Sequence, residues 1–129
     1  MQAPRVTEFR LILYVYHFEE VQHFYEDVIG FPLKHSWCNS TSDHGAMFDT
    51  GCGIIELLAR EIVHDPVTDC KVALQVPNVV ELWERVSKTG YQVTPLVKRP
   101  WGDLDFTIVD PEGFPVIFFS SPPFGFPEP

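Results

Sequence analysis

The stretch that decides the fold is LDFTIVDPEGFPVIFFS, residues 104–120. Its first six residues place apolar side chains at every second position, which is the period of a strand with two different faces. Pro111 presets φ at the second position of a turn, and Gly113 can adopt the positive φ needed where the chain re-enters the sheet. The run from Val116 is typical of a buried strand. The stretch is therefore predicted to be a β-hairpin.

Composition limits the class of protein. The chain has 129 residues, of which 45% are hydrophobic, so one packed domain is expected. The net charge of -9 argues against nucleic acid and anionic membranes as partners. A charged N-terminus and the lack of a long apolar run predict no signal peptide and no membrane span, hence a cytoplasmic protein. The three cysteines are expected to be free thiols because they lack CxxC spacing.

The hydrophobic periodicity predicts two similar halves, followed by a proline-rich tail at 122–129. The first half is predicted to hold strand Phe9–Tyr16, helix Glu19–Ile29 ended by Gly30, and strands Phe31–Cys38, His44–Asp49 and Ile54–Ala59. After a polar connector at 61–69, the second is predicted to hold strand Cys70–Val76, helix Val79–Thr89 with Asn78 as its N-cap, and strands Tyr91–Val97, Leu104–Val109 and Val116–Ser120.

The two halves form an internal repeat. Arg10 matches Lys71 and Glu56 matches Ile117, each 61 positions further along the chain. Two such modules, each too small for a core of its own, would pair to bury their apolar helix faces. The sequence thus predicts a single α+β domain over 1–129, built from βαβββ modules at about 8–60 and 70–121. The free faces of the sheets would curve around a shared hollow.

Three motifs on this duplicated pattern point to a family. They are HFYEDVIGF at 23–31, Pro100-Trp101-Gly102, and Asp110-Pro111-Glu112-Gly113. With them, residues 8 to 121 resemble the vicinal-oxygen-chelate superfamily, which includes glyoxalases, bleomycin resistance proteins and extradiol dioxygenases. The resemblance implies a cleft between two curved sheets, a homodimer and, in the enzymes, a divalent metal in the cleft.

The resemblance also marks the metal positions, and they are altered here. The enzymes carry His or Glu at positions that correspond to Arg10, Glu56, Lys71 and Ile117, so only Glu56 is a metal-binding type. A metal needs lone-pair donors, and neither a protonated arginine nor an isoleucine supplies one. We therefore expect no metal and no cofactor. Arg10, Glu56 and Lys71 would instead form a structural ion cluster, or Arg10 or Lys71 would hold an anionic group of a ligand.

Strand alternation predicts which side chains line the cleft. Beside the four marked positions, the lining would comprise Ile12, Tyr14, Ile54, Leu58, Ala73, Gln75 and Phe119, with Trp37 and Trp101 at the mouth. Such a mixture of apolar, aromatic and a few charged groups is usual for a small-molecule site. The alternative is that these aromatic residues fill the hollow as core.

Other candidate residues have weaker patterns. The five histidines, His17, His23, His35, His44 and His64, lack metal-binding spacing, although His35 and His44 lie on neighbouring predicted strands. Cys38 lacks a positioned base that would make it a reactive thiol, and it is interpreted as a small buried residue.

The functional prediction is a metal-free protein, similar to the bleomycin-resistance branch, that binds a small, aromatic organic molecule. The alternative is an enzyme of the family: a metal-dependent lyase, isomerase or dioxygenase, or one using Glu56 as general base. A structural or interaction module is the third possibility. The negative net charge suits a cationic ligand, whereas Arg10 and Lys71 suit an anionic one.

Overall fold

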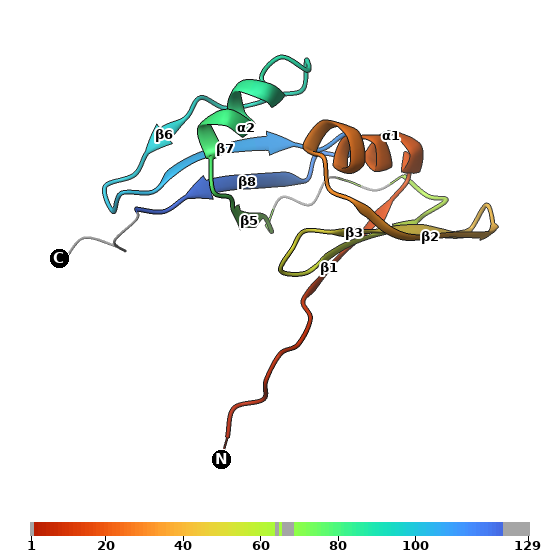
Figure 1. The fold of residues 1–129 in the computed structure, drawn as a ribbon. Helices are drawn as coiled ribbons and strands as arrows, with labels where there is room; N and C mark the ends of the chain where they lie inside the picture. Colours follow the sequence, from red (N-terminus) through yellow and green to blue (C-terminus); the bar gives the residue numbers. More distant parts are fainter. Residues whose placement is uncertain (1, 64, 66–68, 123–129) are drawn as a thin grey trace. The chain divides into compact units, whose positions relative to one another are not determined.

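The computed structural model describes residues 2–63, 65 and 69–122. The chain divides after Asp65 into two compact units, which are described one at a time. Each unit contains a four-stranded mixed sheet and a helical segment (Figure 1). Residues 64, 66–68 and 123–129, which include His64 and the two phenylalanines of the tail, lie outside the described part.

The first unit has the predicted βαβββ order. It comprises β1 (Arg10–Val15), α1 (Phe18–His23), η1 (Phe24–Ile29), β2 (Leu33–Ser40), β3 (Asp43–Asp49) and β4 (Ile54–Ala59). Its strands lie in the order β1-β4-β3-β2, with β1 parallel to β4 and the other pairs antiparallel.

The second unit has the same topology. It comprises β5 (Val72–Gln75), α2 (Val79–Val86), β6 (Val97–Lys98), β7 (Leu104–Val109) and β8 (Pro115–Ser120), in the order β5-β8-β7-β6. Arg10 lies opposite Ile54 in the first unit, and Val72 lies opposite Val116 in the second, so both parallel pairs join residues 44 positions apart. The predicted repeat and the α+β class are confirmed.

The first helical segment changes its winding. A single helix was predicted over Glu19–Ile29, but the α-helical turns of α1 continue as the π-helix η1. Four of the six η1 residues are buried, and the ring of Tyr25 lies 6.2 Å from that of Phe48 on β3. Gly30 then ends the helix with φ of 97°, as predicted.

The second helix has the predicted cap. Asn78 Oδ1 accepts a hydrogen bond from the backbone N–H of Glu81 at 3.1 Å, which satisfies one of the free donors of the first turn. The helix ends at Val86, earlier than predicted, and the hydroxyl of Thr89 donates to the Val86 carbonyl at 2.6 Å.

The predicted strand Tyr91–Val97 is wrong for most of its length. Only an isolated bridge between Val93 and Ile108 and the short β6 are present. Pro95 has no N–H to offer a sheet. The carbonyl of Thr94 accepts from Nε1 of Trp83 at 3.0 Å, while the Thr94 hydroxyl oxygen accepts from the N–H of Thr107 at 2.8 Å. The segment is therefore held by a mixture of side-chain bonds and two backbone bonds to β7, Thr94 N–H to the Thr107 carbonyl and Val109 N–H to the Gln92 carbonyl, and not by a regular ladder.

The hairpin of residues 104–120 forms as predicted. Its turn begins at Asp110, which is only 4% exposed. Oδ1 of Asp110 accepts from the N–H of Glu112 at 2.9 Å and from that of Phe114 at 3.0 Å. Gly113 has a positive φ of 89°. The carboxylate thus ties together the turn that its position in the sequence begins.

Each sheet has one face toward its helix. In the first unit this face carries the buried Val15, Phe48 and Leu57, and in the second it carries Phe106 and Phe118. Helix α1 packs against β4, and α2 packs against β7 and β8. The alternate residues of the same strands form the other face, which holds the candidate site.

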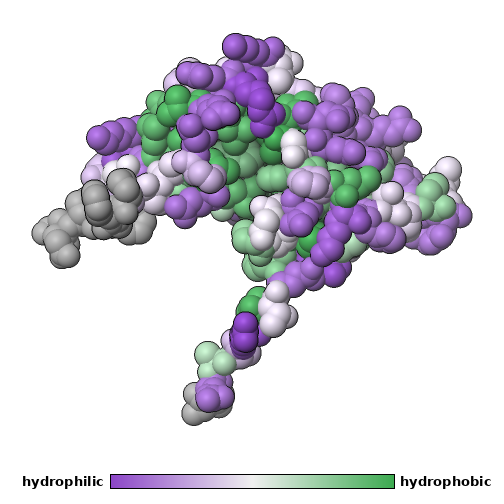
Figure 2. Space-filling view, viewed as in Figure 1, coloured by the Kyte–Doolittle hydropathy of each residue, from purple (hydrophilic) through white to green (hydrophobic). Residues whose placement is uncertain are grey.

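Before β1 the chain is extended (Figure 1). In this segment Val6 and Phe9 are 73% and 66% exposed. Both hydrophobic and hydrophilic residues lie along the segment (Figure 2). Within residues 2–63, 65 and 69–122, no helix is both long and apolar enough to span a membrane.

Candidate functional site

The face of the first sheet that is turned away from α1 is ordered in three rows across the strands. We call it the open face. The charged row holds Arg10, Ile54 and Asp49; the middle row holds Ile12, Glu56, Met47 and His35; and the aromatic row holds Tyr14, Leu58, Gly45 and Trp37. Neighbouring rows are about 6.6 Å apart, because they are two positions apart along each strand and a strand rises about 3.3 Å per residue. The predicted alternation of Arg10, Ile12 and Tyr14 with their partners on β4 is therefore present.

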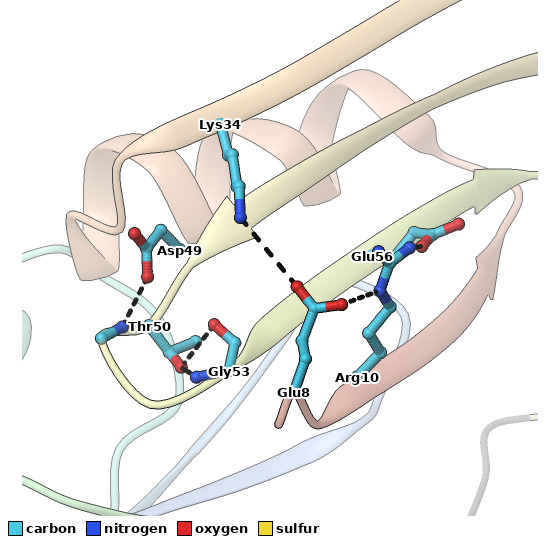
Figure 3. Close-up of polar contacts among 8 residues, drawn as sticks. Glu8, Arg10, Lys34, Asp49, Thr50, Gly53 and Glu56 are labelled. Carbon is cyan, nitrogen blue, oxygen red and sulfur yellow. Dashed lines mark hydrogen bonds and ion pairs between the residues drawn. The ribbon is translucent and has the colours of Figure 1, made fainter. Parts of the chain in front are cut away.

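Arg10 is the centre of an ion cluster at the charged end of this face (Figure 3). Its Nε donates to Glu8 Oε2 at 2.8 Å, and its Nη1 donates to Glu56 Oε1 at 3.1 Å. Lys34 Nζ lies 3.9 Å from the other oxygen of Glu8. The hydrogen bond and charge of Glu8, followed by those of Glu56, raise the pKa of Arg10. Arg10 therefore stays charged throughout the physiological pH range.

The Arg10–Glu56 pair of the predicted cluster is present, and the participation of Lys71, which belongs to the second unit, stays a prediction. Glu8 and Lys34 were missed. Glu8 precedes Arg10 by two residues, so strand alternation could have placed it on the same face. Lys34 had no such signal. It lies at a register shift between Leu33 and His35, where two steps on β2 match one step on β3, and such a bulge redirects a side chain.

A polar pocket of about 260 Å³ adjoins the charged row. Glu8, Lys34, Asp49 and the turn at 51–53 contribute to its lining. The turn is held by Asp49 Oδ1, which accepts from the N–H of Gly51 at 2.8 Å, and by Thr50, whose hydroxyl donates to the Gly53 carbonyl at 3.0 Å (Figure 3). The pocket is thus bordered by charged side chains and a fixed backbone turn.

The middle and aromatic rows expose apolar surface. Ile12 and Tyr14 are 47% and 53% exposed although both lie within a strand. The guanidinium of Arg60 lies 5.1 Å from the centre of the Tyr14 ring, within range of a cation–π interaction. At the opposite edge, the rings of His35 and Trp37 are stacked with their centres 5.8 Å apart. Contiguous exposed apolar surface is typical of interaction sites and ligand-binding grooves.

The second sheet brings together most of its predicted site residues. Ala73 lies opposite Ile117 and Gln75 opposite Phe119, so the four share one face, while Lys71 is exposed just before β5. Trp101 is 47% exposed in the turn between β6 and β7. That the faces of both sheets line one cleft, with Trp37 and Trp101 at its mouth, stays a prediction.

Asp105 and Arg99 were missed on this face. Asp105 lies opposite Phe119. It accepts from Arg99 Nε at 2.7 Å and from Nη2 at 2.9 Å, a two-point ion pair that raises the pKa of Arg99. The hairpin pattern places Asp105 on the face of Thr107, but nothing in the sequence identifies Arg99, which comes from the irregular segment before β7, as its partner.

The residues at the four marked metal positions do not fit a divalent metal. Arg10 directs a donor N–H at Glu56, where a metal would need a lone pair. Ile117 has no donor atom, and Lys71 is an exposed amine. Among the described residues, no three His, Cys, Asp or Glu side chains gather in a way that could hold a metal ion.

The histidines and cysteines take separate positions. His44 packs edge-on against Phe18, with ring centres 4.6 Å apart, and its Nδ1 lies 3.2 Å from the Ser40 carbonyl. His23 Nδ1 lies 2.8 Å from Asp27 Oδ2 on the helix surface, and Tyr16 packs edge-on against His17. Cys38, Cys52 and Cys70 are free thiols, as predicted, and all three are exposed, so the interpretation of Cys38 as a small buried residue is wrong.

Known proteins share this architecture. A glyoxalase/bleomycin resistance protein/dioxygenase from Nocardioides is 20% identical, with a TM-score of 0.73, over 99% of this chain and 91% of that one. A lactoylglutathione lyase from Agrobacterium tumefaciens is 18% identical, with a TM-score of 0.72, over 96% of this chain and 100% of that one. The fosfomycin resistance protein of Listeria monocytogenes is 15% identical, with a TM-score of 0.72, over 95% and 98%.

At these identities the structures show the fold alone. No curated protein matches the chain. The family model described as Glyoxalase/Bleomycin resistance protein/Dioxygenase superfamily matches residues 7–118, which is most of the sequence and includes all three motifs at 23–31, 100–102 and 110–113. This chain belongs to that superfamily.

Proposed function

We propose that the protein binds a small, planar organic molecule on the open face and holds it without a metal. The observation that carries the proposal is the row order of this face, in which aromatic and apolar side chains lie directly beside the Arg10–Glu56 pair. An apolar floor with few, fixed polar groups is the usual composition of a ligand site. Exposing Ile12 and Tyr14 costs hydrophobic stabilisation, of about 25 cal/mol per Å², which a bound ligand would restore.

The Arg10–Glu56 pair would orient the polar group of the ligand. Glu8 engages Nε of Arg10, and Glu56 engages Nη1 through one oxygen. Among the bonds between described residues, Nη2 of Arg10 and Oε2 of Glu56 are left for a ligand. Because Glu8 also holds Arg10, the guanidinium would be positioned before the ligand arrives, which lowers the entropic cost of binding.

The proposal extends to the residues of the second unit. Lys71, Ala73, Gln75, Trp101, Ile117 and Phe119 would complete the binding surface. The protein would act as a homodimer in the cytoplasm.

Three naphthalene probes that differ only in charge test this function: 2-naphthalenemethanol, 2-naphthoate and 2-naphthylmethylamine. At least one should raise the melting temperature, because a ligand that binds only the native state stabilises it. Tyr14→Ala should reduce the shift, whereas Val80→Ala, which removes an exposed apolar side chain from α2, should not.

Metal analysis completes the experiment. We expect no stoichiometric metal in the purified protein and the same thermal shift in the presence of EDTA. Stoichiometric zinc, manganese, nickel or iron would contradict the metal-free site. If none of the three probes shifts the melting temperature, the binding function itself is wrong.

A further inference from the structure

The indole of Trp37 approaches the backbone of β3 closely because the residue opposite Trp37 on that strand has no side chain. Trp37 is paired with Gly45, and Gly45 is buried. A Cβ atom placed on Gly45 would clash with Cζ2 of Trp37 and would lie 2.5 Å from its Cη2. The six-membered ring of the indole therefore occupies the space that any other residue at position 45 would fill.

Two further contacts hold the indole in this orientation. Nε1 of Trp37 donates to Oδ1 of Asp43 at 3.4 Å, and the ring of His35 stacks against it with planes inclined by 23°. Trp37 is thus supported from below by the backbone at Gly45, at its nitrogen by Asp43 and along its side by His35. A tryptophan fixed in this way is positioned before a ligand arrives, which lowers the entropic cost of binding.

The space that Gly45 leaves for the indole also makes the aromatic row continuous. Gly45 lies opposite Leu58, and Leu58 lies opposite Tyr14, so the row crosses all four strands. The strands are about 4.8 Å apart, and the row therefore spans about 14 Å. With a larger residue at position 45, the indole would tilt away from the sheet and divide this row.

We infer that Gly45 is a specificity-determining residue of the proposed binding site and that it acts by positioning Trp37 as a stacking surface for flat rings. The inference rests on the proposed function. Offset stacking needs two planar faces at van der Waals distance, and a saturated ring of the same carbon skeleton cannot form it. The site should therefore distinguish ligands by flatness as well as by apolar area.

The test compares two probes of identical carbon skeleton, 2-naphthalenemethanol and decahydro-2-naphthalenemethanol. Their dissociation constants are measured by titration of backbone amide NMR shifts. The wild type should bind the flat probe about three- to tenfold more tightly. In Gly45→Ala this ratio should fall to about one. A ratio of two affinities in one protein is insensitive to a general loss of stability, so a purely structural role of Gly45 would leave it unchanged.

A Cβ at position 45 would also lie 2.6 Å from the Leu57 carbonyl oxygen, so Gly45→Ala could impair folding. Trp37→Leu therefore provides a second variant, which keeps glycine at position 45 but loses the flat indole ring. This variant should also lower the ratio of the two dissociation constants to about one. Trp37→Phe, which keeps an aromatic ring, should have a ratio between that of Trp37→Leu and that of the wild type. Val80→Ala, which removes an exposed apolar side chain from α2, outside the proposed binding surface, is the control and should keep the wild-type ratio.

The outcomes separate this inference from the proposed function. If the wild type binds both probes equally, or if Trp37→Leu keeps the discrimination, the role of Gly45 is wrong while the binding function stands. If the wild type binds neither probe nor the charged naphthalenes, the binding function fails and the inference falls with it.

Discussion

Asp49 and Asp110 lie 61 residues apart and make the same hydrogen bond in the two halves of the protein. Each begins the hairpin turn before the last strand of its unit. Oδ1 of Asp49 accepts from the N–H of Gly51 at 2.8 Å, and Oδ1 of Asp110 accepts from the N–H of Glu112 at 2.9 Å. Asp110 Oδ1 also accepts from the N–H of Phe114, and Asp110 is buried whereas Asp49 is exposed. The two halves thus share the same aspartate hydrogen bond in this turn, but the aspartate is buried only in the second half.

Asp110→Ala should lower the free energy of unfolding by about 3 kcal/mol, because it removes a charged acceptor from two backbone donors in a buried turn. Asp49→Ala, the matched control, removes one bond at an exposed site and should cost about 1 kcal/mol. Urea denaturation of the two variants measures the difference. Equal losses would show that burial does not set the contribution of this aspartate.

Trp83→Phe should destabilise the protein by about 1 kcal/mol, since it removes the hydrogen bond to the Thr94 carbonyl while keeping most of the apolar contact. The effect should be local. Hydrogen exchange should accelerate at the N–H of Thr94, which donates to the Thr107 carbonyl at 3.0 Å. Trp101→Phe serves as control and should leave this amide unchanged. Unaltered protection in Trp83→Phe would mean that the irregular segment does not depend on the indole.

Gly30→Ala should cost about 1 kcal/mol, because φ at this position is 97° and a Cβ is strained there. Gly30→Asn should cost less, since asparagine tolerates the left-handed region better than alanine does. Thermal unfolding of the pair gives the order. A smaller loss for alanine would contradict the left-handed helix end.

In a double-mutant cycle, Arg10 should couple more strongly to Glu8 than to Glu56. Glu8 makes the shorter hydrogen bond and is the main cause of the raised pKa of Arg10. Since the folded-state pKa lies above the unfolded one, the contribution of Arg10 is fully present below the unfolded pKa. It is lost only as pH rises through the folded value. Ionisation of Arg10 should therefore cause no change of stability between about pH 6 and 9. Stronger coupling to Glu56 would reverse this ranking.

The prediction from sequence was most accurate for helices and strands whose ends are marked by turn or capping residues within the same segment. The ranges of β4 and β7 agree residue for residue with the prediction, because the apolar run of β4 and the alternating run of β7 each begin directly after a glycine-containing turn. The N-cap at Asn78 and the helix end at Gly30 agree for the same reason. The sequence also grouped the residues of the open face correctly along β1 and β4, since alternation is a local property.

Non-local contacts account for the differences. The strand predicted over Tyr91–Val97 fails because Trp83, eleven residues before Thr94, takes the carbonyl that a strand would use. Lys34 reaches Glu8 only because of a register shift on β2. Neither partner choice is visible in a window of sequence, and the contact of Lys34 places a charged group at the candidate site.

The π-helical turn of η1 affects how the family can vary in length. A π-turn holds one residue more than an α-helical turn over the same path, so it amounts to an insertion that the helix has absorbed. The additional residue leaves the buried contacts of Phe24, Tyr25, Val28 and Ile29 in place. Deleting one residue here would rewind the segment as an α-helix and rotate everything before it by about 100° relative to the end at Gly30. The π-helical winding therefore fixes how the chain before the helix is turned relative to its end at Gly30.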